Sequence, residues 1–291
     1  EDLPIFEKHN IAFTNGSEKG NYYLSLTYLD NNGIVKGDAD VYKRLTATIN
    51  SEYEIKSWLK VGTTNQIEKY NTRTVSSNNE YGSMLASILQ TDPLTPFSYT
   101  YDELPSNMLK PMLEGKHFLD DGNGNYYAVS KFTAGESYHP MIMRDNNINK
   151  SSGFNVNGSI YADFKPIKDI TITSRFGYRL SGSRSSNTDL PFYGNATQSR
   201  DYVSHNASSS TNIYYQWENF ANYMKRFGMH TVTGMVGMSY QESTNDYVNG
   251  SLSANGEDAV KKNDPLFYFL NYGSASATKG VGGGETRSGQ L

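Results

Sequence analysis

The sequence contains no cysteine, which excludes disulfide-linked scaffolds, cysteine-based zinc sites and thiol catalysis. It also contains no run of about 18 apolar residues, the length that a membrane-spanning helix needs. Lys and Arg number 26 against 30 Asp and Glu, and no basic block occurs, so nucleic acid is not an expected partner. The first residues lack the basic and apolar regions of a signal peptide, so we expect a cleaved signal or a piece of a longer protein.

Motifs of catalysis and metal binding are scarce as well. The five histidines show neither HxxxH nor HxH spacing, so they predict no metal site. Asp120–Asn125 resembles the start of a calcium loop, but Lys131 and Phe132 stand where that loop needs its last acidic ligand. We therefore expect no catalytic residue, no metal and no cofactor, and we expect that the chain is not an enzyme.

Aromatic residues are abundant by comparison, with 23 Tyr and 13 Phe but only 2 Trp. Many lie in segments where apolar and polar residues alternate, which is the period of a β-strand with one apolar face. Eight such segments, separated by turn residues, predict an all-β, antiparallel fold. The expected strands lie near residues 9–15, 21–30, 41–55, 57–70, 153–166, 169–183, 209–226 and 228–243.

The two faces of a strand are clearest in residues 153–166, where Phe154, Val156, Ile160 and Phe164 alternate with polar residues. Apolar positions flanked by aromatic residues at both ends are typical of strands that face lipid between two interfacial girdles. The residues that we expect to face lipid are Leu24, Leu26, Leu45, Ile49, Val156, Ile160, Phe164, Ile172 and Val236. The charged residues that we expect to face a water-filled lumen are Arg44, Glu52, Asp163, Arg175 and Arg179.

A soluble, lectin-like β-sandwich also has strands with one apolar face, so it is an alternative. The expected strands run to about 10–15 residues, whereas most strands of soluble proteins are about 5–6 residues long. This length and the aromatic strand ends favour an antiparallel transmembrane β-barrel.

Short and long connections alternate along the chain. The short ones lie at residues 16–20, 55–57, 166–169 and 227–228, and the long ones at about 31–40, 71–152, 184–208 and 244–291. Because bacterial barrels have short periplasmic turns and longer extracellular loops, we expect the long connections outside the cell. Within residues 71–152, apolar residues recur at helical spacing from Tyr81 through Met84, Leu85 and Ile88, and Pro93 ends the pattern, which predicts one short helix.

Tyrosines in the long connections are candidates for contact with a ligand or with a lid protein. The candidates are Tyr99, Tyr101, Tyr126, Tyr127 and Tyr193. Aromatic side chains on outer loops can stack on sugars or pack against peptides, and they can equally pack a loop on itself. The sequence leaves both interpretations open.

Several segments together resemble SusC/RagA-type TonB-linked outer-membrane proteins. They are, in order, residues 21–37 (NYYLSLTYLDNNGIVKG), 42–50 (YKRLTATIN), 58–62 (WLKVG), 217–219 (WEN) and 227–231 (FGMHT). No single segment is specific, but their order and spacing hold across about residues 10–243.

The resemblance implies a barrel of about 22 strands with a plugged lumen, of which this chain contains about eight strands. Residues 1–291 are then part of the barrel domain of a TonB-dependent receptor, with 71–152 as a long extracellular loop, and the plug domain and the remaining strands are absent. The glycine-rich residues 282–291 are expected to form a loop rather than a strand.

The function that the resemblance implies is active import of large nutrients across the outer membrane of a Gram-negative cell. Oligosaccharides are the first expected cargo and oligopeptides the second. The implied partners are a SusD-like surface lipoprotein, outer-membrane lipid, and TonB, which the missing N-terminal part contacts. The alternative is a small autonomous outer-membrane barrel with an adhesive or structural role.

Overall fold

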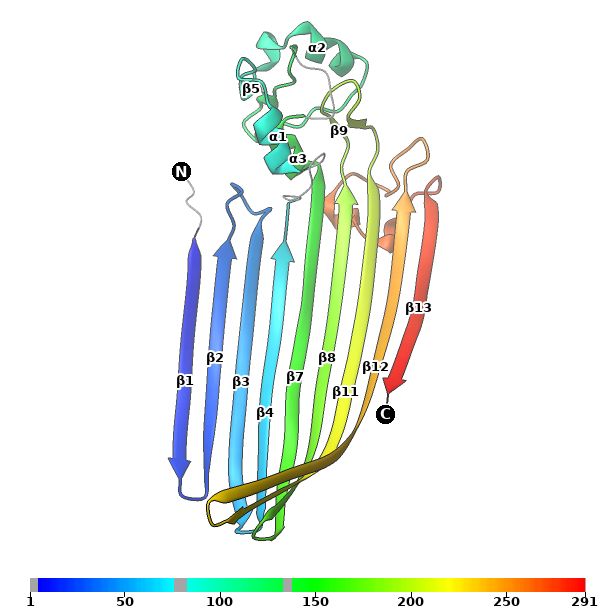
Figure 1. Cartoon of the computed structure of the whole chain (residues 1–291). Coiled ribbons are helices and arrows are strands. Elements are labelled where there is room, and N and C mark those ends of the chain that lie inside the picture. Colours follow the sequence, from blue (N-terminus) through cyan, green and yellow to red (C-terminus); the bar gives the residue numbers. More distant parts are fainter. Residues whose placement is uncertain (1–4, 76–82, 133–137, 291) are drawn as a thin grey trace.

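The alternating segments build one antiparallel sheet, which the computed structural model describes over residues 5–75, 83–132 and 138–290. The sheet has nine strands in the order β1-β2-β3-β4-β7-β8-β11-β12-β13 (Figure 1). This is also their order along the chain, so each strand pairs with the one before it and the one after it. Their bounds are β1 Phe6–Ser17, β2 Gly20–Asn32, β3 Val41–Lys56, β4 Leu59–Arg73, β7 Asn147–Ile167, β8 Ile170–Asp189, β11 Ser204–Phe227, β12 His230–Ser253 and β13 Thr278–Gln290.

All eight predicted strands are present, and each is longer than its predicted range. The longest, β11 and β12, have 24 residues each. A transmembrane strand needs only about 9–11 residues, so these strands extend well beyond the thickness of a bilayer. The alternation of apolar and polar residues stops before the strands end. Strand residues outside the apolar part of the sheet have no apolar face to form, so they need no alternation.

The expectation of a loop at residues 282–291 is wrong, since β13 covers nearly all of them and pairs with β12 from Gln241 to Ser253. Glycine is depleted in strands, but here it leaves room for side chains of β12. A Cβ atom at Gly280 would lie 2.5 Å from the Ser251 hydroxyl, and one at Gly282 would lie 2.5 Å from the Asn249 amide oxygen. Pairing with the edge of β12 therefore makes this segment a strand.

Short and long connections alternate as predicted. The short ones are two-residue turns, Glu18-Lys19, Ser57-Trp58, Lys168-Asp169 and Gly228-Met229. Gly228 adopts a φ of 61°, which glycine reaches without steric cost. Every two-residue turn lies at one end of the sheet and every long connection at the other (Figure 1).

The predicted short helix is α1 (Met84–Gln90), and Ser83 caps it by accepting a hydrogen bond from the Ala86 N–H at 3.1 Å. Tyr81, which was expected to begin the pattern, lies outside the described residues. The expectation of a single helix is incomplete, because the long connections contain further short elements. These are β5 Ser98–Tyr99, η1 Tyr101–Glu103, α2 Ser106–Leu113, β6 Tyr126–Tyr127, α3 Pro140–Asp145, β9 Phe192–Tyr193, β10 Ser199–Arg200, η2 Pro265–Phe267 and η3 Leu270–Tyr272.

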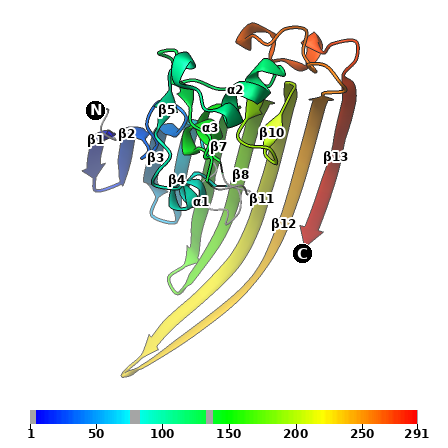
Figure 2. The same ribbon diagram turned by 90° about the horizontal axis from the view of Figure 1, so that it is seen from above.

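The sheet is a single curved layer, and the helices gather at its long-connection end (Figures 1 and 2). We call residues 83–132, 138–146 and 190–203 the loop cap. The three clusters of buried apolar side chains within the described residues lie in this cap or beside the connection from β12 to β13. None of the described helices has the length and apolar character needed to cross a membrane.

Candidate functional site: the two faces of the sheet and the loop cap

The register of the sheet determines which side chains share a face. Directly paired residues of antiparallel strands point to the same side, so the pairs Leu24–Ile49 and Ile160–Phe176 lie on one face, which we call the apolar face. All nine residues that the sequence predicts to face lipid lie on it, namely Leu24, Leu26, Leu45, Ile49, Val156, Ile160, Phe164, Ile172 and Val236. The five residues predicted to face a lumen, Arg44, Glu52, Asp163, Arg175 and Arg179, lie on the opposite, polar face.

The apolar face has no second layer over most of its area. Ile160 is 55% exposed although it lies between two paired strands, and Val236, which pairs with Ala221 of β11, is 73% exposed. Exposed apolar patches on soluble monomers rarely exceed a few hundred Å². A face of this kind therefore needs an apolar environment around it.

The apolar residues form an oblique band across the sheet. Following the register from Leu26 on β2 over six strand steps leads to Thr244 on β12. The apolar residues of β12, Val236 and Met238, lie eight and six residues before Thr244, so the band moves by about one residue per strand. A residue adds about 3.3 Å along a strand, and neighbouring strands are about 4.8 Å apart. The band therefore lies parallel to a membrane plane when the strands tilt by about 35–45° from the membrane normal, which is the tilt of transmembrane barrels.

Aromatic side chains border this band on both sides. Toward the two-residue turns lie Tyr53, Trp58 and Tyr223, and toward the long connections lie Tyr28, Tyr178, Tyr215 and Tyr240. Trp58 packs edge-on against Phe164, with 5.5 Å between the ring centroids. Tyrosine and tryptophan at both edges of an apolar band are typical of side chains at membrane–water interfaces.

Asn65 interrupts the apolar face, but its side chain is paired. Its amide nitrogen donates to the Thr63 hydroxyl at 2.7 Å, and its amide oxygen accepts from the Tyr178 hydroxyl. A polar group in an apolar environment costs free energy unless it is hydrogen-bonded. The neighbouring side chains therefore make this position compatible with the band.

The polar face has a network of hydrogen bonds and ion pairs that joins neighbouring strands. Glu52 accepts from the Lys60 ammonium at 2.8 Å and from the Tyr161 hydroxyl at 2.7 Å, which links β3, β4 and β7. The other four predicted residues also contact neighbouring side chains. Arg44 lies 3.5 Å from Glu68, and Asp163 accepts a hydrogen bond from Thr173 at 2.7 Å. Arg179 donates to Asn157 at 3.1 Å, and Arg175 lies over the rings of Tyr161 and Phe220. The charged side chains of this face are therefore paired across neighbouring strands.

The candidate tyrosines occupy different positions in the loop cap. Tyr127 and Tyr193 are buried, and Tyr193 packs on Phe118 with 4.9 Å between the ring centroids. Tyr99 and Tyr126 are half-buried against the same apolar cluster. Tyr101 is 55% exposed and remains accessible to a ligand or partner. Packing of the loop on itself thus accounts for four of the five.

His139 organises the centre of the cap. Its Nδ1 accepts a hydrogen bond from the Met141 N–H at 3.2 Å and so caps α3. The imidazole stacks on the Tyr127 ring with 5.1 Å between the ring centroids, and Phe97 meets both rings edge-on. Burial lowers the pKa of His139 to about 4, so the ring is neutral near pH 7, as its acceptor role requires.

Arg144 joins two long connections. Its guanidinium donates to the Lys36 carbonyl at 2.9 Å, in the connection between β2 and β3, and to Asp145 at 2.6 Å. The Tyr127 hydroxyl also donates to Asp145, at 3.0 Å. Burial, together with the Asp145 charge, raises the pKa of Tyr127 to about 12, so this hydroxyl keeps its proton.

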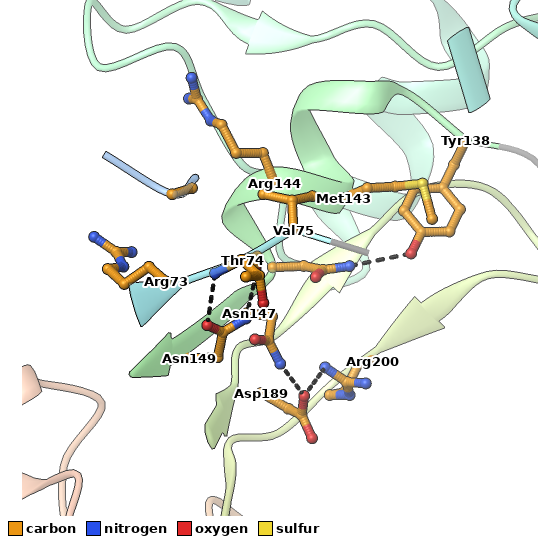
Figure 3. A pocket seen from close by; sticks show the side chains of 12 residues that line it. Arg73, Thr74, Val75, Tyr138, Met143, Arg144, Asn147, Asn149, Asp189 and Arg200 are labelled. Carbon is orange, nitrogen blue, oxygen red and sulfur yellow. Dashed lines mark hydrogen bonds and ion pairs between the residues drawn. The ribbon is translucent and has the colours of Figure 1, made fainter. Parts of the chain in front are cut away.

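A polar cavity of 310 Å³ lies between the cap and the strand ends (Figure 3). Asn147, Asn149 and Asp189 line it from the polar face, and Arg200 lies 3.4 Å from Asp189. Amide and guanidinium groups around a polar cavity can donate several hydrogen bonds to a polar ligand. Within the described ranges, no group of three His, Asp or Glu side chains is arranged to hold a metal ion.

Comparison with known proteins agrees with this geometry. No family model matches the chain. A curated relative, TonB-dependent receptor P39 of Formosa agariphila, is 23% identical over 282 residues, which are 96% of this chain and 24% of the relative. Structures of the RagAB peptide importer in its closed-closed and open-open states match with TM-scores of 0.67 and 0.66 at 20% identity. Each match covers 97% of this chain, and 29% and 28% of the respective matched chains.

The single curved sheet, with its two unlike faces, shares its fold with part of the chain in the RagAB importer structures. The curated relative and the shared fold confirm the resemblance to SusC/RagA-type receptors that the sequence segments indicate. These relatives are named as a receptor and an importer rather than as enzymes, in agreement with the expectation from the sequence. The chain spans about a quarter of the length of the curated relative.

Proposed function

We propose that this chain is an arc of the wall of an outer-membrane β-barrel that imports large nutrients. The observation that carries the proposal is the oblique apolar band, which becomes level at the strand tilt of membrane barrels. The apolar face then meets lipid, and the polar face meets the lumen or a plug inside a barrel of about 22 strands. The long connections lie outside the cell, and the two-residue turns lie in the periplasm.

Energy for import comes from TonB, which the N-terminal part of the whole protein contacts. A SusD-like lipoprotein covers the loop cap from outside. Both partners rest on the SusC/RagA resemblance, and the solved neighbours, named as an importer in closed-closed and open-open states, support an import role. Tyr101 and Phe97, 55% and 56% exposed, are the cap aromatics best placed for a partner or a cargo.

The cargo that we propose is an oligosaccharide, and an oligopeptide is the second candidate. The polar cavity at Asn147, Asn149 and Asp189 offers amide and carboxylate groups that suit either class. The name of the solved neighbours, a peptide importer, supports the second candidate. Uptake of labelled oligosaccharides and oligopeptides by cells with and without the full-length protein separates the two.

A small autonomous barrel fits the described residues less well. In the described sheet β1 pairs with β2 and β13 pairs with β12, and β1 and β13 stand at opposite edges. A closed barrel pairs its first strand with its last. A lectin-like sandwich is disfavoured as well, because no second sheet packs on the large one within residues 5–75, 83–132 and 138–290.

Two arginine substitutions in the full-length protein test the assignment of the faces. Ile160→Arg places a charge in the middle of the band and should destabilise the barrel by about 2–4 kcal/mol, because lipid cannot solvate the charge. Ser159→Arg, one residue away on the polar face, should change stability little. The measurement is the temperature at which the folded, fast-migrating species disappears in a heat-modifiability gel, and equal losses for both variants would refute the proposal.

A further inference from the structure

Five basic side chains gather on the apolar face just beyond the band, toward the long connections. They are Lys43, Lys69, Arg73, Lys150 and Arg184, and we call them the basic cluster. The register places Lys43 and Arg184 in one row across β3, β4, β7 and β8, through Asn71 and Ser152. Phe154, at the edge of the band, stands two positions from Ser152 along β7.

The cluster has more positive charge than its neighbours neutralise. Lys43 pairs with Asp30 at 2.8 Å, and Arg73 pairs with Asp38. Among the described residues, Lys69, Lys150 and Arg184 have no acidic partner and no side-chain hydrogen bond. Along β8, Arg184 stands two positions from Gly182, in the row of Lys69, and two positions from Ser186, in the row of Lys150. The three cations therefore span about 13 Å along the sheet, which suits one extended anionic headgroup.

Two adjoining cavities surround this cluster. The larger, of 860 Å³, is lined by Lys43, Arg73, Lys150 and Arg184. The β12–β13 connection forms its other wall with Tyr268, Phe269 and Leu270, and Leu270 is held against Gly250, where a Cβ atom would lie 2.6 Å from Leu270 Cδ1.

The second cavity, of 470 Å³, leads toward the apolar band. It shares Asn71, Ser152 and Arg184 with the larger one and reaches Lys69 and Phe154. A molecule in the two cavities therefore meets cations and aromatic or aliphatic loop residues at one end. At the other end it meets the edge of the surface that we propose to face acyl chains.

We propose that the basic cluster binds the phosphorylated sugar headgroup of a glycolipid in the outer leaflet, with the acyl chains lying along Phe154 and Val156. Phosphate is the anion that suits the cluster, because arginine pairs with it through two parallel hydrogen bonds and lysine adds a point charge. A headgroup larger than a single phosphate fits the combined cavities. This proposal rests on the membrane placement of the apolar face.

The test uses the full-length protein, purified in detergent and stripped of lipid. Native mass spectrometry counts the bound molecules after incubation with a diphosphorylated glycolipid, with the same glycolipid after removal of its phosphates, with a zwitterionic phospholipid, or with inorganic phosphate. The double variant Lys150→Ala/Arg184→Ala is compared with Lys19→Ala/Lys168→Ala, which removes the same charge from two-residue turns at the other end of the sheet.

We expect the wild type and the turn variant to bind the phosphorylated glycolipid equally, and the cluster variant to bind it roughly tenfold less, because two charge-assisted hydrogen-bond donors are lost. Removal of the phosphates should weaken binding to the wild type to a similar extent. Equal binding by both double variants overturns the proposal, as does equal binding of the dephosphorylated glycolipid, of the phospholipid or of inorganic phosphate alone. A failure here with the Ile160→Arg result intact leaves the proposed function standing.

Discussion

The sheet and the loop cap use the same kinds of residue in opposite ways. In the cap, apolar side chains turn inward, and Met108 and Ile142 are almost fully buried at 0% and 1% exposure. In the sheet, apolar side chains of similar size, such as Leu26 at 50% exposure, turn to the open face. The difference supports the proposed placement, with water around the cap and lipid against the apolar face of the sheet.

Polar residues form similar pairs in both regions. Glu52, Lys60 and Tyr161 are joined to one another on the polar face of the sheet, and Lys116 and Asp201 form a 2.8 Å ion pair in the cap with similarly exposed side chains. An exposed pair of charges contributes little to stability by itself. The strands thus rely on backbone pairing and on polar contacts along one face, and the cap relies on its apolar clusters.

The largest effect that should separate the two regions comes from truncation of the cap core. Met108→Ala removes a fully buried side chain whose sulfur also accepts from the Val129 N–H at 3.3 Å, and it should destabilise the cap by about 2–5 kcal/mol. Leu26→Ala on the apolar face should cost less, because lipid fills the space that the side chain leaves. Hydrogen exchange of the two segments in the full-length protein measures both effects, and a larger loss at Leu26 would contradict the comparison.

A second effect is specific to the cap and depends on pH. The pKa of His139 is about 4 in the fold, below its ordinary value of about 6.5. Between these values the unfolded cap binds more protons than the folded cap, so the stabilisation is complete above about pH 6.5 and is lost as the pH falls toward 4. The loss should reach about 2–3 kcal/mol.

Limited proteolysis of the cap between pH 7 and pH 4 measures this loss, with the sheet as internal reference. His139→Asn is the matched control, because an asparagine oxygen can accept the Met141 hydrogen bond at the same capping position and does not titrate. Equal acid sensitivity of this variant and the wild type would assign the effect to another group.

The smallest effect concerns the polar face of the sheet. A Cβ atom at Gly62 would collide with the Tyr161 ring, so Gly62→Ala should displace that ring from Glu52 and cost about 1–3 kcal/mol. Gly234→Ala is the control, since nothing lies within 4 Å of its added Cβ atom, and it should be neutral. Thermal unfolding of both variants measures the difference, and a neutral Gly62→Ala would show that the Tyr161 contact is dispensable.

The alternation of residues was enough to predict the eight strands and the two faces. Side chains of a strand point alternately to opposite sides, so Ile160 and Ser159 are separated by backbone geometry alone. The turns were predicted where the alternation of apolar and polar residues ends. Because short and long connections alternate along the chain, all long connections were predicted at one end of the sheet. The β13 strand could not be predicted, because its glycines disfavour a strand and only the edge of β12 stabilises it.

The positions in the loop cap depended on contacts between distant residues. Tyr127 and Tyr101 look equivalent in the sequence, but Tyr127 is enclosed by His139 and Phe97 whereas Tyr101 stays exposed. The basic cluster also could not be predicted from the sequence. Lys43 and Arg184 are 141 positions apart in the numbering, and only the register of four strands places them in one row.

The sequence by itself determined that the fold is all-β, which residues share each face and where the chain turns, because these depend on neighbours one or two residues away. The tertiary structure decided the register that makes the apolar band oblique, the burial of the cap tyrosines and the gathering of basic residues beyond the band. Those features depend on the register between strands and on loop packing, where residues far apart in the chain are brought together by hydrogen bonds and burial that no local pattern encodes.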